Sequence, residues 1–253
     1  MLALAWDTAS EWFTLALSVI ESEQHTRTLY EVSIKGAGSH SALLPEHVGK
    51  ALDGNNLTAC DLDLIAVGRG PGSFTGLRAG ISYAKGLAFG AKVPLIGVPS
   101  LMAFAMIDLK GPRLIAPVID ARHKEVFSSL YLIEGPQNAP KLPQGLGAIL
   151  VVKPQDIYEE ISRLLSKLPP KLLSSIKGPV LLNGAACALL PPAPEGFEIL
   201  PPKGPEPSSV ALLGAILSKR ESLLDNPPLP LYGRTPEIFK TWKPPERINK
   251  SDS

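Results

Sequence analysis

"LIAVGRGPGSFTGLRAG", residues 64–80, joins an apolar run, a glycine-rich turn and the start of a helical pattern. A strand that turns through glycines into a helix is a common layout for binding phosphate, because the helix N-terminus presents free amides. Gly70, Gly72 and Gly76 read G-x-G-x-x-x-G, and no G-K-S/T follows, so the loop matches neither the dinucleotide fingerprint nor a Walker loop. Two interpretations stay open: a turn that only shapes the backbone, or an anion site with Ser73 capping the helix.

The helix that follows the loop carries a stripe of small residues. Glycine inside a helix costs about 1 kcal/mol relative to alanine, so Gly80 needs compensation from the close approach of another backbone. That backbone belongs either to the protein's own sheet or to a second subunit. The small residues recur every four positions: Gly76, Gly80, Ala84 and Ala88.

Strand and helix patterns on either side of the loop predict a mixed sheet. Three consecutive strands, the first two antiparallel, precede a helix in which Pro45 is expected in the first turn. Helices then alternate with further strands, which places helices on the faces of the sheet. The expected strands are 2–6, 13–19, 26–34, 62–68 and 93–98, and the expected helices are 41–53, 76–90 and one from about residue 100.

The second half of the chain repeats this theme. AWDTAS and VIDARH each end an apolar run at an aspartate, Asp7 and Asp120, as a duplicated two-lobed fold would. Four of the 26 prolines lie in residues 1–110 and the other 22 beyond, which favours extended loops there. We expect an N-terminal lobe over 1–110, a smaller second lobe over 111–226 and an extended tail over 227–253. In the second lobe we expect strands at 113–122, 125–133 and 147–154, a strand-to-turn segment at 178–186, and helices at 154–168 and 208–221.

Composition is that of an ordinary globular protein, with 45% hydrophobic and 19% charged residues. A net charge of +1 gives no electrostatic case for tight, unaided binding of nucleic acid. The N-terminus has no basic leader, and Asp7 interrupts its apolar run, so it fits neither a signal peptide nor a membrane span. Cys60 and Cys187 match no metal or redox motif. The default location is the cytoplasm.

Asp7, Thr8 and Ser10 resemble the first phosphate hairpin of sugar kinases and actin-like ATPases, in which a carboxylate organises magnesium. Turn hydrogen bonding explains the same D-T-x-S pattern equally well. Asp120 has Arg122 beside it, which can neutralise it locally. An enzyme using Asp7, Asp120 and Ser73 of the glycine loop around magnesium, an actin-like ATPase or small-molecule kinase, is therefore the alternative function.

The histidines predict no metal site. His40 and His47 are seven residues apart, two helical turns, which is too far for one zinc ion without ligands from elsewhere. The other two are His25 and His123. No Ser-His-Asp order or reactive-cysteine context stands out, so covalent hydrolysis, including a peptidase, has little support.

Several motifs together resemble the bacterial TsaB (YeaZ) family. They are HSALLPEHV, LDLIAVGRGPGSFTGLRAGISYAKGLAFG, PLIGVPSL and VIDARHKEVFSSLY, with LLNGAA and LPLYGRTPE further on. The resemblance is specific over residues 2–133 and looser to about residue 236.

This resemblance implies an α/β actin-like (ASKHA) fold of two lobes with mixed β-sheets, the second lobe reduced. TsaB proteins are paralogues of TsaD, which transfers threonylcarbamoyl from threonylcarbamoyl-adenylate to the adenosine beside the anticodon of tRNAs that read A-starting codons. TsaB is the non-catalytic partner, not itself an enzyme. It pairs with TsaD through N-terminal-domain helices, in an assembly with the ATPase TsaE, and would meet tRNA only within that complex.

The resemblance also implies no cofactor and no metal for this chain alone. In the TsaD pattern two histidines four apart on a helix bind the active-site metal, whereas Ser100 and Phe104 stand at those places here. A homodimer of the isolated chain, and an ATP or ADP at an inter-subunit site, stay open.

The partner surface is expected on the helices 41–53 and 76–90. The expected interface residues are Leu44, His47 and Val48 on the first helix, and Gly76, Leu77, Gly80 and Ala84 on the second. The residues of the vestigial phosphate site are Asp7, Thr8, Gly72, Ser73 and Asp120.

Overall fold

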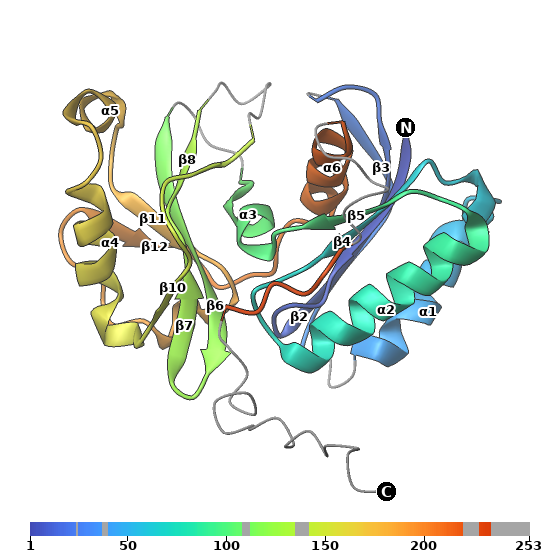
Figure 1. The fold of residues 1–253 in the computed structure, drawn as a ribbon, viewed down its shortest axis with the longest axis horizontal. Coiled ribbons are helices and arrows are strands. Elements are labelled where there is room, and N and C mark those ends of the chain that lie inside the picture. The colour runs from blue at the N-terminus through green and yellow to red at the C-terminus, as the bar shows by residue number, and fades with distance from the viewer. Residues whose placement is uncertain (24, 37–39, 108–111, 135–141, 220–227, 234–253) are drawn as a thin grey trace, which may run out of the picture.

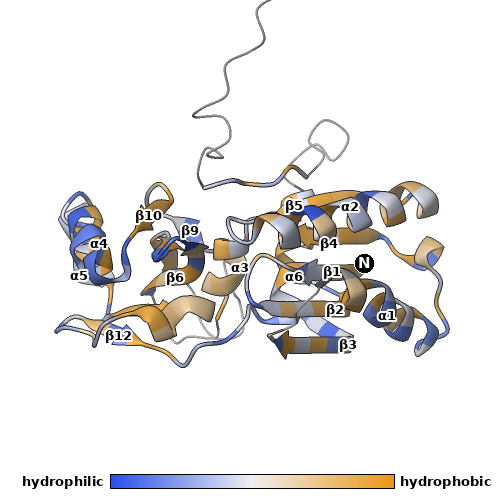
Figure 2. Ribbon diagram, turned by 90° about the horizontal axis from the view of Figure 1, so that it is seen from below, coloured by the Kyte–Doolittle hydropathy of each residue, from blue (hydrophilic) through white to orange (hydrophobic). Residues whose placement is uncertain are grey.

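The computed structural model describes residues 1–23, 25–36, 40–107, 112–134, 142–219 and 228–233. Within these residues the strands form two sheets, one in each of two lobes that lie side by side (Figure 1). Figure 2 shows hydrophobic strands at the centre of the lobes and hydrophilic positions on outer helices such as α1 and α4. No helix in the described part of the chain is long and apolar enough to cross a membrane.

The first sheet has five strands in the order β3-β2-β1-β4-β5. As predicted, β1 and β2 are antiparallel neighbours, and β3 continues the antiparallel arrangement. β4 and β5 return through helical crossovers and lie parallel to β1. The strands are β1 Leu2–Asp7, β2 Trp12–Ile20, β3 Thr26–Lys35, β4 Leu64–Gly68 and β5 Leu95–Val98.

Helices cover both faces of this sheet. α1 (His40–Asp53) and α2 (Phe74–Ala91) pack on one face, where Trp6 and Phe13 are fully buried between sheet and helices. α1 begins at His40, so Pro45 lies in its second turn and not in the first turn as expected. Pro45 thus interrupts the backbone hydrogen bonding of this helix, because proline has no N–H to donate.

α6 (Pro207–Ser218) covers the opposite face of the first sheet. The sequence places this helix in the second lobe, but the structure returns it to the first. The side chains of Ala3, Ala5 and Ala66 on that face of the sheet are small, and Gly214 lets the helix backbone come close to Ala66. The helix is therefore buried on most sides and reads as almost uniformly apolar.

The second lobe has β6 (Arg113–Arg122) at its centre, paired with β7 (Glu125–Ser128), β8 (Tyr131–Ile133) and β11 (Val180–Asn183). One strand was expected over 125–133, but the structure breaks it into β7 and β8. Ser128 pairs with Val118 and Tyr131 with Ile115, so the break at Ser129 falls opposite Pro117. The ladder opens there because proline has no N–H to donate.

The remaining elements of the second lobe are short. β10 pairs with β7 and β12 with β11, and α4 packs on the sheet through Ile157 and Ile161. They are α3 Ser100–Ala105 at the junction of the lobes, β9 Gln144–Gly145, β10 Leu150–Val152, α4 Ile157–Leu165, α5 Pro170–Ser175 and β12 Phe197–Ile199, with short 3-10 turns at Ala59–Asp61, Pro154–Asp156 and Ala185–Leu189.

Residues 228–233 form an extended segment that crosses from the first lobe to the second (Figure 1). Pro228 packs against Gly97, and the Leu231 amide donates to the Arg69 carbonyl at 2.6 Å. At the far end, Gly233 lies against the ring of Phe127 on β7. The predicted extended tail therefore begins as a strap between the lobes, and its remaining residues, 234–253, lie outside the described part of the chain.

The glycines of α2 have two different environments. Gly80 is buried against β1, where a Cβ would overlap the Thr8 hydroxyl, and the Gly80 carbonyl accepts a hydrogen bond from Trp6 Nε1 at 3.2 Å. Gly76 faces the Thr8 carbonyl in the same way. By contrast, a Cβ at Gly86 would meet nothing within 4 Å. The small-residue stripe at Gly76 and Gly80 thus lets the helix approach the protein's own sheet.

Gly80→Ala should lower the free energy of unfolding by about 1–3 kcal/mol, because the added methyl group has no room beside Thr8. The matched substitution on the same helix, Gly86→Ala, should raise it by about 0.4–1 kcal/mol, because the position is open and the unfolded chain loses conformational freedom. Urea denaturation of both variants measures the difference. Equal effects of the two substitutions would contradict this packing.

Candidate functional site

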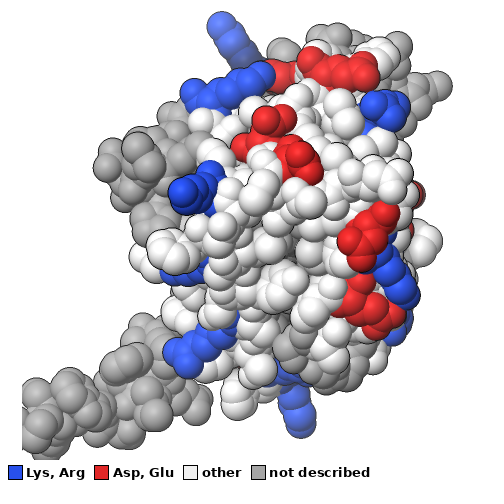
Figure 3. Space-filling model, turned by 90° about the vertical axis from the view of Figure 1, so that its right-hand side faces the viewer, with Lys and Arg blue, Asp and Glu red and all other residues white. Residues whose placement is uncertain are grey.

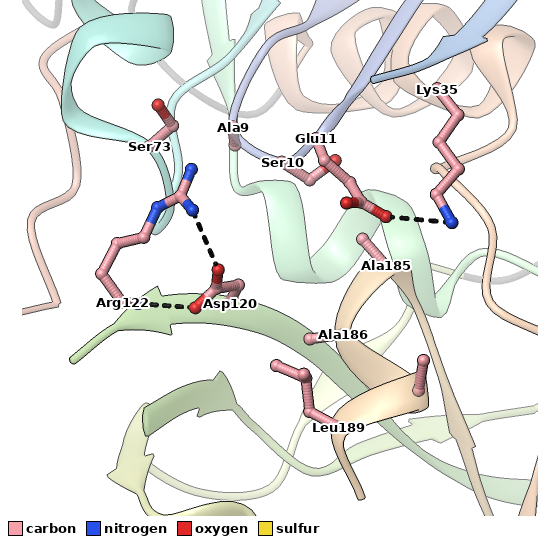
Figure 4. A pocket seen from close by; sticks show the side chains of 11 residues that line it. Ala9, Ser10, Glu11, Lys35, Ser73, Asp120, Arg122, Ala185, Ala186 and Leu189 are labelled. Carbon is pink, nitrogen blue, oxygen red and sulfur yellow. Dashed lines mark hydrogen bonds and ion pairs between the residues drawn. The ribbon is translucent and has the colours of Figure 1, made fainter. Parts of the chain in front are cut away.

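A cleft of about 220 Å³ lies between the lobes, where the sequence predicts a vestigial phosphate site. The β1–β2 turn, the N-terminus of α2 and the end of β6 contribute side chains from three directions (Figure 4). Its lining residues are Ala9, Ser10, Glu11, Lys35, Ser73, Asp120, Arg122, Ala185, Ala186, Ala188 and Leu189.

The charged groups of this cleft neutralise one another. Arg122 Nη1 lies 3.3 Å from Asp120 Oδ2, and the Arg122 backbone amide donates to Asp120 Oδ1 at 2.7 Å (Figure 4). Lys35 Nζ lies 3.5 Å from Glu11 Oε1. All four side chains are well exposed, so each pair contributes little stability. The predicted local neutralisation of Asp120 by Arg122 is confirmed.

Asp7 does not line the cleft, although it ends β1 much as Asp120 stands near the end of β6. It is completely buried, and Gly68 of β4 leaves the space in which its carboxylate lies. Asp7 Oδ2 accepts a hydrogen bond from Ser100 Oγ at 2.5 Å, and Oδ1 accepts one from the Ala9 amide at 2.7 Å. The expected pair of acids therefore does not converge on a shared ion: one is buried and the other is exposed.

Burial raises the pKa of Asp7 above its ordinary value, and the hydrogen bonds from Ser100 and Ala9 oppose this rise. Desolvation is the largest effect because the carboxyl group is completely buried. Asp7 thus behaves as a buried structural acid.

Ser100 is the residue that sequence reasoning missed here, since it was considered only as the replacement of a histidine. Its hydroxyl donates to Asp7 and accepts from the Gly70 amide at 3.0 Å, while its own amide donates to the Gly70 carbonyl at 2.8 Å. It thereby joins β1, the glycine loop and α3. No local pattern signals this contact, because Asp7 and Ser100 are 93 residues apart.

The polar groups of the glycine loop are used within the chain. The Ser73 amide donates to the Ala9 carbonyl at 2.6 Å, and Ser73 Oγ accepts from the Gly76 amide at 3.2 Å, so Ser73 caps α2 as predicted. Thr8 is buried and donates to the Gly76 carbonyl at 2.8 Å, while Gly72 lies against the Ala9 carbonyl. Of the five residues predicted for a phosphate site, only Ser73 and Asp120 line the cleft. These contacts favour the structural interpretation of the loop.

The residues predicted to face a partner are buried inside the chain, and that expectation is corrected. His47 is 8% exposed, its Nδ1 lies 2.6 Å from the Tyr30 hydroxyl, and its ring lies beside Phe13. Burial, followed by the charge of Lys50, lowers the pKa of His47. The apolar stripes of both helices are needed to cover the first sheet. The buried set is Leu44, His47, Val48, Gly76, Leu77, Gly80 and Ala84.

The outward face of α2 carries a different set of residues. Phe89 is 89% exposed, and Gly90, like Gly86, has open space at its Cβ position. Ser82 is also exposed and lies one turn before Gly86. On the side of the molecule where α1 and α2 lie, charged side chains stand mainly around the margin of an uncharged area (Figure 3). No three His, Cys, Asp or Glu side chains of the described residues form a group that could hold a metal ion.

The pKa of Asp7 predicts a pH dependence with a definite sign. A raised folded-state pKa means that the folded state binds the proton more tightly than the unfolded state, so this stability is present at low pH and lost as pH rises through the folded pKa. Asp7→Asn cannot ionise. Its free energy of unfolding should therefore shift upward relative to wild type as pH rises from about 4.

Asp61→Asn provides a control of opposite sign. Hydrogen bonds from the Thr58 amide and hydroxyl lower the pKa of Asp61. The free energy of unfolding of the wild type should therefore rise relative to that of this variant as pH rises. Urea denaturation between about pH 2 and 8 measures both differences, because the Asp61 difference develops mainly below about pH 4 and the Asp7 difference above it. A pH-independent difference for Asp7→Asn would contradict the burial of a raised-pKa acid.

Sequence comparisons associate the chain with proteins of tRNA modification. Residues 34–143 match the family model "TsaD: tRNA N6-adenosine threonylcarbamoyltransferase". The chain is 33% identical to the tRNA threonylcarbamoyladenosine biosynthesis protein TsaB of Escherichia coli over 166 residues, 65% of this chain and 68% of that protein. The TsaB protein of Haemophilus influenzae is 36% identical over 128 residues, 50% of this chain and 52% of that protein, so there the chain spans about half the relative's length.

Solved structures agree on the fold. YeaZ from Pseudomonas aeruginosa superimposes with a TM-score of 0.66 at 24% identity, covering 91% of this chain and 99% of that one. A second structure from that organism, described as similar to peptidase YEAZ, gives a TM-score of 0.67 at the same 24% identity, covering 92% of this chain and 99% of that one. The two mixed sheets with their helices are thus the α/β, actin-like fold that the sequence predicts. With the identity and coverage of its Escherichia coli relative, the chain belongs to the TsaB (YeaZ) family.

Proposed function

We propose that this chain is a non-catalytic subunit that acts in the cytoplasm and supports a TsaD-type paralogue. The paralogue would transfer threonylcarbamoyl from threonylcarbamoyl-adenylate to the adenosine next to the anticodon of tRNAs that read A-starting codons. Membership of the TsaB family supports the broader part of this proposal, a role in threonylcarbamoyladenosine biosynthesis. The finer part, a supporting role without its own catalysis, rests on α3.

The observation that carries the proposal is the use made of Ser100 and Phe104. These two residues stand where the TsaD pattern has its metal-binding histidines. Ser100 is completely buried, and its hydroxyl donates a hydrogen bond to Asp7 and accepts one from the Gly70 amide. Phe104 is 1% exposed and belongs to the apolar core between the lobes. The side chains on this helix thus stabilise the junction of the lobes and offer no donor to a substrate.

A TsaD-type partner would pack on the outward face of α2. Ser82, Gly86 and Gly90 are exposed and spaced four residues apart, which lets a second helix come close to this one. Phe89 beside them is a large, nearly fully exposed aromatic side chain of the kind that anchors protein interfaces. The match of residues 34–143 to the TsaD family model favours a paralogue as the occupant, since related helices pair by the same packing rules. A TsaE-type ATPase would join this assembly elsewhere.

Reconstitution tests the function directly. Modification of a cognate tRNA by TsaD and TsaE, supplied with threonylcarbamoyl-adenylate, should require this chain, and the isolated chain should hydrolyse no ATP. ATP hydrolysis by the chain alone that is lost in Asp7→Asn would instead establish the actin-like ATPase or kinase. Modification at the full rate without the chain would contradict the supporting role.

The partner surface is tested by Phe89→Glu, which should weaken binding to TsaD by at least 10-fold because a charge replaces an interface anchor. Leu173→Glu on α5 introduces the same charge at an exposed leucine of the second lobe and should leave binding unchanged. Isothermal titration calorimetry with folded variants measures both affinities. If Phe89→Glu abolishes only self-association in sedimentation experiments and keeps TsaD binding, the face is that of a homodimer.

A further inference from the structure

The turn between β6 and β7 holds three basic side chains in an unusual backbone conformation. Arg122, His123 and Lys124 all have positive φ, at 62°, 52° and 61°. Left-handed conformations are unfavourable for residues with a Cβ, and such positions usually carry glycine, or less often asparagine, aspartate or histidine. All three residues are exposed. Strained backbone of this kind concentrates at functional sites. Three consecutive basic side chains at such a turn are therefore candidates for binding a ligand.

A second hollow lies beside this turn and is distinct from the cleft between the lobes. It measures about 660 Å³ and is open to solvent. His123 and Lys124 contribute from the turn, Lys153 contributes from the end of β10, and no carboxylate is among the residues that line it. Leu189, 53% exposed, forms an apolar wall shared with the inter-lobe cleft. We call the hollow lined by His123, Lys124, Lys153 and Leu189 the cationic hollow.

The lysines of the cationic hollow are available to an anion. Within the described residues, neither Lys124 nor Lys153 has a carboxylate within ion-pair distance. Arg122, the other cation of the turn, is engaged by Asp120 on the side of the inter-lobe cleft. Asp156 follows Lys153 by three residues but is not part of the lining. Among the described residues these two lysines have no carboxylate partner, and they come from different elements, with His123 next to Lys124 and an apolar wall beside them. Such a group suits a phosphate-bearing polymer better than a lone anion.

We propose that the cationic hollow contacts the sugar–phosphate backbone of the tRNA that the complex modifies. Lys124 and Lys153 would each neutralise a phosphate, His123 would donate to a phosphate or ribose oxygen, and Leu189 would pack against a ribose or an unstacked base. The inference rests on the proposed function, which brings tRNA to this chain. With a net charge of +1 the chain alone is a weak RNA ligand, so the hollow adds to a surface supplied mainly by the partner.

Salt-dependent binding of tRNA to the complex of this chain with its TsaD tests the proposal. The double variant Lys124→Gln/Lys153→Gln should bind fluorescently labelled tRNA about 10-fold more weakly at low salt, and the slope of log K against log salt should fall by about 1–2. The matched control Lys167→Gln/Lys171→Gln removes two exposed lysines near the other end of α4. It should leave slope and affinity unchanged.

Lysine footprinting gives an independent readout on the wild-type complex. Saturating tRNA should protect Lys124 and Lys153 from acetylation, read by mass spectrometry, and leave Lys167 and Lys171 reactive. Unchanged binding by the first double variant, or an equal loss in both, would overturn the proposal. So would protection of Lys124 and Lys153 by polyglutamate with no protection by tRNA, which would identify an acidic protein as the ligand.

Failure of this inference is separable from failure of the proposed function. If the wild-type chain joins TsaD and stimulates modification, but the lysine variants bind tRNA normally, only the cationic hollow is misassigned. If the wild-type chain neither joins TsaD nor stimulates modification, the proposed function fails whatever the lysines do.

Discussion

The hydrogen bonds of buried Asp7 hold together three segments of the structure that are far apart in the sequence. The carboxylate receives the Ser100 hydroxyl and the Ala9 amide, and Ser100 in turn holds Gly70 at both its amide and its carbonyl. One acid thereby connects β1, the glycine loop and α3. A buried carboxylate is costly unless its lone pairs are satisfied, so each partner in this network depends on the others.

This network gives Asp7 a structural role in the actin-like fold. A carboxylate that organised magnesium would have to reach the cleft between the lobes, whereas Asp7 is enclosed beside Gly68 and bonded to α3. Thr8 likewise donates a hydrogen bond to the Gly76 carbonyl of α2, and Gly72 packs against the Ala9 carbonyl. The charged side chains exposed in the cleft form two weak surface ion pairs, Lys35–Glu11 and Arg122–Asp120. The surfaces that we propose for function lie elsewhere: the outward face of α2 and the cationic hollow.

The errors of sequence reasoning have specific physical causes. The stripe of Gly76, Gly80 and Ala84 signals a close approach of backbone, but spacing cannot say whether the approaching backbone belongs to β1 or to another molecule. α6 is apolar on nearly all sides, so its sequence does not say which sheet it covers. The break between β7 and β8 could not be predicted from the sequence, because it depends on the strand register that places Pro117 opposite Ser129.

The sequence by itself determined the order of strands and helices in the first lobe up to α3, the capping of α2 by Ser73 and the membership of the TsaB family. These follow from periodicity, turn residues and motifs, all of which are local along the chain. Only the tertiary structure decided that Asp7 is buried while Asp120 is exposed, that the small residues of α2 face inward, and that Lys124 and Lys153 share one hollow. Each of these depends on contacts between residues far apart in sequence, and burial and electrostatic environment are properties of such contacts and not of the residues alone.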